Sequence, residues 1–79
     1  MPSIEAIEAL LAKEPDDVFL NFSLAMALVS AGRKREALER FARTLELDAR
    51  YVPAHFQRGR LLADLGREDE ARAALEHGI

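Results

Sequence analysis

The sequence repeats itself at an interval of 34 residues, and this repeat is the feature that most restricts the folds open to the chain. Two further places keep the size or apolar character of the residue, Ala25 on Gly59 and Phe41 on Leu75. A repeat of this length is typical of a stacked array, in which each copy is one supersecondary unit that packs on its neighbours. The residues that are identical at this interval include Phe22 and Phe56, Leu28 and Leu62, Gly32 and Gly66, Arg33 and Arg67, Glu36 and Glu70, and Ala37 and Ala71.

Each copy divides into two helical segments at its glycine. Apolar residues recur at three- and four-residue spacing before Gly32, and a second stripe with the same spacing begins at Ala37. A glycine just past the last periodic residue can take the left-handed conformation that ends a helix without steric strain. We therefore predict turns at Gly32 and Gly66. The predicted helices, about five in number, cover residues 3–13, 17–31, 34–47, 52–65 and 68–78.

The composition favours the same interpretation. The chain is rich in Ala, Leu, Glu and Arg, which are good helix formers, and poor in the β-branched and aromatic residues that strands prefer. Its 79 residues are enough for one domain, and without cysteine that domain has neither a disulfide nor a thiolate metal site. The N-terminus lacks the basic-then-apolar pattern of a secretory signal, and the apolar stretches are too short to span a bilayer, so we expect a soluble, cytoplasmic protein.

With this period and these positions, the chain resembles the tetratricopeptide repeat (TPR) family. The most specific part of the match is the small residue in the first helix of each copy, with the later alanine followed by Phe or Leu. The sequence departs from the family pattern at Asn21 and His55, where a bulky residue is usual, at Arg58 in place of leucine, and at Ala49 in place of proline. The matching positions are Leu24, Ala25, Leu28, Ala37 and Phe41 in the first copy, and Gly59, Leu62, Ala71 and Leu75 in the second.

The resemblance implies an all-α fold, a right-handed α-α superhelix of antiparallel helix pairs. It also implies a division of the single domain, residues 1–79, into three parts. Residues 1–17 would be the second helix of a partial repeat, residues 18–51 a complete repeat, and residues 52–79 a second repeat truncated near its end.

In this family the first helix of each repeat lines a concave groove that binds extended peptides or helices. The resemblance therefore implies a partner-binding groove here, in which Arg60 is the leading candidate for a polar contact. Phe22 and Phe56 have an alternative role, because their position often packs between helices. Phe22 and Met26 stand where the subclass that grips the carboxylate of heat-shock chaperones has Lys and Asn, so that specialisation is not expected. The candidate partner-binding residues are Phe22, Met26, Ser30, Phe56, Gln57 and Arg60, with Ser23 and Asp64 beside them.

The charged residues suggest mostly solvated helix faces. Glu36 with Arg40, Glu39 with Arg43, and Glu68 with Arg72 have the acid four residues before the base, which is the favourable order for a helical ion pair. The run Arg33, Lys34, Arg35 is different, because positive charge at a helix start opposes the helix dipole. Two interpretations of this run remain open: ordinary surface charge, or a contact for a phosphate or an acidic partner.

The residues provide little for catalysis. His55 and His77 fall on different predicted helices without a partner that marks a nucleophile or a metal site, so we interpret them as surface or interface residues. The glycines are isolated, which argues against a phosphate-binding loop. The net charge is −3, and Tyr51 is the only tyrosine, which argues against nucleic-acid binding. We expect neither enzyme activity nor a cofactor, catalytic residue, metal or membrane contact.

The sequence thus predicts a module that binds a protein or peptide partner, such as a scaffold or adaptor. Two alternatives stay open. The chain could be a structural unit that self-assembles through its end helices into a homodimer or a larger homo-oligomer, since the predicted last helix leaves an apolar edge uncovered near Ile79. It could also be an accessory part of a larger protein.

Overall fold

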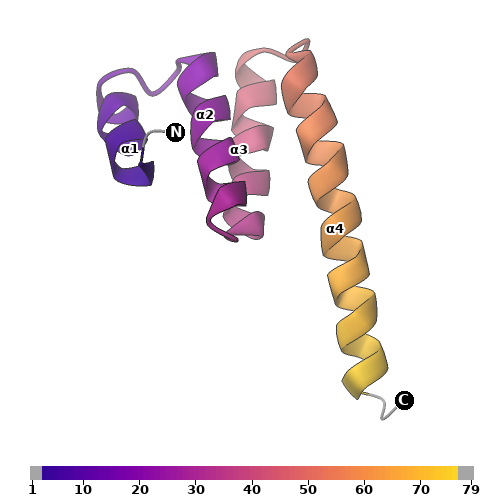
Figure 1. Cartoon of the computed structure of the whole chain (residues 1–79). Coiled ribbons are helices and arrows are strands. Elements are labelled where there is room, and N and C mark those ends of the chain that lie inside the picture. The colour runs from indigo at the N-terminus through magenta and orange to yellow at the C-terminus, as the bar shows by residue number, and fades with distance from the viewer. Residues whose placement is uncertain (1–2, 77–79) are drawn as a thin grey trace.

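The structure, a computed structural model that describes residues 3–76, consists of four α-helices: α1 (Ile4–Lys13), α2 (Val18–Ser30), α3 (Lys34–Leu47) and α4 (Val52–Glu76). The helices stand side by side in chain order and alternate in direction, and α4 continues well past the ends of its neighbours (Figure 1). The dimensions are accordingly elongated, 49 × 27 × 17 Å. The predicted all-α fold of antiparallel, TPR-like helices is confirmed.

Short side chains and one glycine set the first helix boundaries. Ser3 Oγ accepts a hydrogen bond from the Ala6 amide at 3.1 Å, and Asp17 Oδ1 accepts one from the Leu20 amide at 2.8 Å, so α1 and α2 both begin with a capped N-terminus. Gly32 ends α2 as predicted: its φ is +78°, and the next amide, of Arg33, bonds back to the Leu28 carbonyl at 2.9 Å.

Gly66 does not end a helix, and this part of the prediction was wrong. α4 runs without interruption from Val52 to Glu76 and replaces the two helices expected over 52–65 and 68–78. Glycine permits a turn but does not enforce one, because in a helix interior it costs only about 1 kcal/mol relative to alanine. The residues after Gly66 are strong helix formers with a thin apolar stripe, in which Leu75 stands where the first copy has Phe41. Folding back would bury little, so a continuous helix is favoured.

The core lies between α1, α2 and α3 and extends onto one side of α4. Ala25 and Ala37 are fully buried, and their small side chains let α2 and α3 approach closely. Phe41 is the largest fully buried side chain, and its ring centroid lies 5.9 Å from that of Phe22, which in turn lies 5.3 Å from that of Tyr51. The other buried apolar residues are Ile7, Leu11, Leu24, Ala27, Leu28, Ala54, Leu61 and Leu65.

Asn21, a departure from the family pattern, is a buried polar connector. Its side-chain amide donates to the Pro15 carbonyl at 3.0 Å and to the Asp17 carbonyl at 2.9 Å, which fixes the connection between α1 and α2. Its Oδ1 accepts from Arg40 Nη1 at 3.0 Å, which ties the same point to α3. One side chain therefore joins three elements, a role that a larger apolar residue would not fill.

The ion pairs differ from those predicted within helices. Among the described residues, Arg40 bonds to Asn21, Arg43 pairs with Asp16 at 2.8 Å and with Glu46 at 3.6 Å, and Glu68 pairs with Lys34. The predicted pairs at four-residue spacing are thus not among the pairs that form, because Arg40, Arg43 and Glu68 find partners on neighbouring elements. Such exposed pairs contribute about 0–1 kcal/mol each.

We expect Asn21→Ala to lower the free energy of unfolding by about 2–4 kcal/mol, since it removes the side-chain partner of the Pro15 carbonyl and of the Arg40 guanidinium, and the second hydrogen bond to the Asp17 carbonyl. Urea denaturation followed by circular dichroism measures the change. His55→Ala is the matched control, because His55 holds the same place 34 residues later but is exposed; its effect should stay within about 0.5 kcal/mol. Equal losses in the two variants would contradict the role given to Asn21.

Gly32, which forms a turn, and Gly66, which lies inside α4, should respond in opposite ways to substitution by alanine. Gly32→Ala places a Cβ at φ +78° and should destabilise the chain by about 1–2 kcal/mol. Gly66→Ala should instead increase helix content and stabilise α4 by about 0.5–1 kcal/mol, because nothing lies within 4 Å of the added Cβ. Far-UV circular dichroism and urea denaturation of both variants test this, and a loss of helix in Gly66→Ala would show that the chain turns at that glycine.

Candidate functional site

A groove lies between α2 and α4, where the sequence analysis placed the partner-binding surface. It contains a depression of about 230 Å³. Met26 and Val29 of α2 form one side, and Leu61 of α4 adds to the apolar floor. The polar residues that line it are Gln57, Arg60 and Asp64, all on α4.

Helical spacing explains why these residues share one face. Arg60 and Leu61 lie three and four residues after Gln57, and Asp64 lies four and three residues after them, which places all four on one side of α4. Met26 and Val29 are three residues apart on α2 and face them from the other side of the groove. The residues that line the site thus come from α2 and α4 alone, and no loop residue is among them.

Phe56 and Arg60 form a pair at the rim of this groove. Phe56 is 62% exposed, and the Arg60 guanidinium carbon lies 5.8 Å from the centroid of its ring, which is a cation–π geometry. A large apolar ring and a cation are therefore presented together to solvent. This combination suits a ligand that carries both an apolar group and a carboxylate.

The structure divides the predicted site residues. Met26, Gln57 and Arg60 line the depression, and Phe56 stands beside Arg60. Phe22 is instead half-buried and packs against Phe41 and Tyr51, which is the alternative that its position allowed. Ser30 is exposed at the end of α2 and does not line the depression. Val29 and Leu61 were missed, although each lies three or four residues from a predicted groove residue on the same helix.

The basic run at the start of α3 already has acidic partners within the chain. Lys34 pairs with Glu68 and Arg35 with Asp69, both on α4, while Arg33 pairs with Glu36. The hydrogen bond to Glu68 raises the pKa of the Lys34 ammonium. Because α4 is continuous, the acidic residues Glu68 and Asp69 of this helix lie beside the basic run. Two interpretations of the run were open from the sequence, surface charge or a contact for a phosphate or an acidic partner, and in the structure the acidic groups come from the chain itself.

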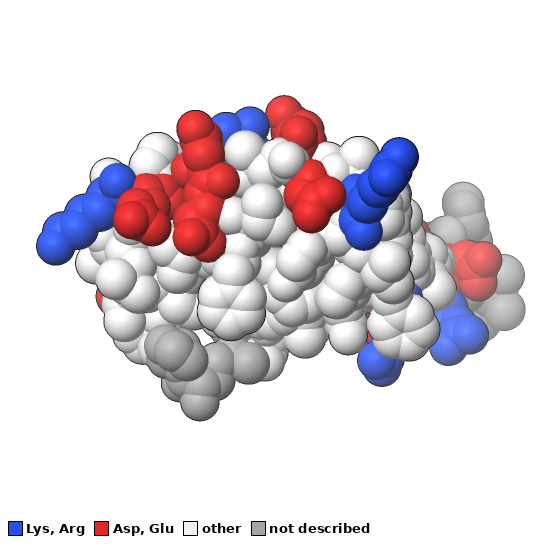
Figure 2. All heavy atoms as spheres, turned by 90° about the horizontal axis from the view of Figure 1, so that it is seen from above, with Lys and Arg blue, Asp and Glu red and all other residues white. Residues whose placement is uncertain are grey.

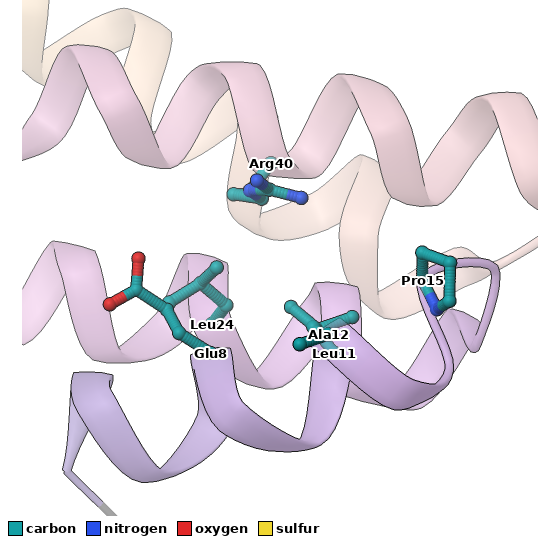
Figure 3. Close-up of a pocket in the computed structure, with 6 residues that line it drawn as sticks. All are labelled: Glu8, Leu11, Ala12, Pro15, Leu24 and Arg40. Atoms are coloured by element: carbon teal, nitrogen blue, oxygen red, sulfur yellow. The ribbon is translucent and has the colours of Figure 1, made fainter.

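A second depression, of about 260 Å³, lies between α1 and α3 (Figure 3). Its walls are Glu8, Leu11, Ala12 and Pro15 from α1 and its following turn, with Leu24 and Arg40 opposite. Arg40, the cation of this depression, already donates a hydrogen bond to Asn21, the buried polar connector described above. This depression is therefore part of the scaffold, whereas Arg60 and Asp64 of the α2–α4 groove are exposed.

Viewed from the end that carries the α1–α2 and α3–α4 connections, acidic and basic side chains gather along one margin, uncharged residues fill the centre, and further basic side chains stand at the lower right (Figure 2). Within residues 3–76, no group of three His, Asp or Glu side chains is placed to hold a metal ion. None of the four described helices has the length and apolar character needed to cross a membrane. His55 is exposed and its Nε2 lies 2.7 Å from the Ala49 carbonyl oxygen, while His77 and Ile79 lie outside the described residues.

Comparison with known proteins agrees with this architecture. Residues 1–76 match the sequence model of the family described as tetratricopeptide repeat. A tetratricopeptide repeat and J domain-containing co-chaperone of Fusarium oxysporum f. sp. lycopersici is 36% identical over 66 residues, which are 84% of this chain and 13% of the co-chaperone. A TPR repeat-containing protein of Pseudomonas aeruginosa is 33% identical over 76 residues, 96% of this chain and 72% of that protein.

No solved structure is significantly similar to the chain. The family assignment therefore depends on the sequence match and on the antiparallel helices, which agree with each other. Since the family's sequence model covers residues 1–76 and the structure has the helical repeat that this model implies, the chain belongs to the tetratricopeptide repeat family.

Proposed function

We propose that the chain binds a peptide or a helix of a partner protein in the groove between α2 and α4. TPR repeats generally mediate protein–protein interaction, and one relative is a co-chaperone. The observation that carries the proposal is the depression in which Met26, Val29 and Leu61 form an apolar floor beside Gln57, Arg60 and Asp64. A non-catalytic role as an adaptor or scaffold follows from this site.

The groove selects for ligand chemistry. Its volume of about 230 Å³ suits a side chain or two rather than a drug-sized molecule, which would need about 300–1,000 Å³. The flexible Met26 side chain adapts to apolar groups of different shape. Arg60 offers a planar, bidentate donor to a carboxylate, and Gln57 can bond to a peptide backbone. The preferred ligand is therefore a peptide with an apolar residue next to an acidic one.

A panel of synthetic peptides that pair Leu, Phe or Met with Asp or Glu tests this function. Binding of the labelled chain is followed by chemical-shift changes in nuclear magnetic resonance spectra. The expected result is a set of shifts confined to Met26, Val29, Gln57, Phe56 and Arg60. Shifts confined to α1 or to the start of α3 would contradict the site.

Arg60→Ala should weaken binding of an acidic–apolar peptide by about tenfold to a hundredfold, because it removes a charge-assisted hydrogen bond worth about 1.5–3 kcal/mol. Arg58→Ala is the matched control: Arg58 is also exposed on α4 but does not line the depression. Isothermal calorimetry gives both affinities. Equal weakening by the two substitutions would show that only net charge matters and would remove the role given to Arg60.

A further inference from the structure

Beyond partner binding in the groove, the two end helices leave matching surfaces uncovered. The inner helix α3 packs against both α2 and α4, whereas the main contact of α1 is with α2 and that of α4 is with α3. The 34-residue frame makes α1 the counterpart of α3, because residues 3–13 correspond to residues 37–47. The same frame makes the first part of α4 the counterpart of α2.

On α1, the uncovered surface is the counterpart of the α3 surface that packs on α2. Ile7 and its counterpart Phe41 are both buried, so this part of the packing is common to α1 and α3. Leu10, however, is 52% exposed, whereas its counterpart Thr44 is completely buried. Ser3 is also exposed, whereas its counterpart Ala37 is buried.

On α4, the uncovered surface is the one that α2 presents to α3. Leu62 is 44% exposed, whereas its counterpart Leu28 is 3% exposed. Gly59 is exposed where Ala25 is buried, and it leaves room for a close helix approach, since nothing lies within 4 Å of the position of its missing Cβ. The chain thus carries both halves of the α2–α3 interface a second time, one half at each end.

The repeat frame makes the two surfaces unlike and complementary. The α1 face is the counterpart of the α3 face that packs on α2, and the α4 face is the counterpart of the α2 face that packs on α3. Two α1 faces or two α4 faces lack this match, so the frame selects a head-to-tail arrangement of copies.

We propose that copies of this chain associate head to tail, with α1 of one copy packed on the Gly59–Leu62 face of α4 of the next. The contact repeats the packing of α3 on α2, with Leu10 of the partner copy in the place of Thr44. Because each contact leaves one α1 face and one α4 face free, the assembly is open and does not close at a dimer. α4 continues past the ends of its neighbours without folding back (Figure 1), and Gly59 and Leu62 on this face are exposed.

Two single variants and their mixture test the arrangement. Leu10→Glu blocks the α1 face and Leu62→Glu blocks the α4 face, and both positions are exposed, so the fold, checked by circular dichroism, is expected to persist. In analytical ultracentrifugation the average mass of the unmodified chain should rise steadily with concentration. Each variant alone should lose about tenfold or more in association constant, and an equimolar mixture should form a one-to-one dimer and nothing larger.

The mixture separates this arrangement from its alternatives. A symmetric contact between two α4 helices would leave Leu10→Glu fully associating, and a closed dimer of the unmodified chain would also overturn the proposal. Leu75→Glu is the control, because Leu75 is exposed outside both faces and should not change association. A monomer at every concentration that is destabilised by Leu62→Glu and Leu75→Glu alike would show that residues 67–76 fold back onto the α4 face instead.

Discussion

The close packing of α2 on α3 is the contact on which the rest of the structure depends. It is possible because Ala25 and Ala37 are small enough for the two backbones to approach, and because Phe41 fills the space that remains. Gly32 fixes the turn that brings the two helices together. Once this pair is formed, α1 and α4 have flat, apolar surfaces on which to pack, and the groove between α2 and α4 follows from their spacing.

Much of this could be predicted from the repeat. The interval of 34 residues predicted the antiparallel helices, and the resemblance to the tetratricopeptide repeat implied a groove with Met26, Gln57 and Arg60, which line one depression in the structure. The role of Asn21 could not be predicted, because its hydrogen bonds reach the Pro15 carbonyl and Arg40, which only the folded chain brings near. Gly66 was misinterpreted for a related reason: whether a glycine turns depends on how much apolar surface the following segment can bury.

The continuous α4 also explains the charges at the start of α3. Three basic residues at a helix N-terminus are unfavourable on their own. In the folded chain Glu68 and Asp69 lie opposite Lys34 and Arg35, and the residues of each pair are 34 positions apart. The chain therefore has opposite charges at equivalent positions of its two neighbouring repeats. These pairs guide how one repeat stacks on the next within the chain more than they add to stability.

Partner binding and head-to-tail association are linked by geometry. In a stack of copies, α1 of the next chain would occupy the place of a second repeat helix beside α4, and α2 of that chain would follow in line. The groove between α2 and α4 would then continue between α4 and the next α2. A single chain offers room for only a side chain or two, which limits its affinity, whereas a stack offers the same chemistry repeatedly along one surface. Weak individual sites and an open assembly are therefore compatible features of one short repeat chain.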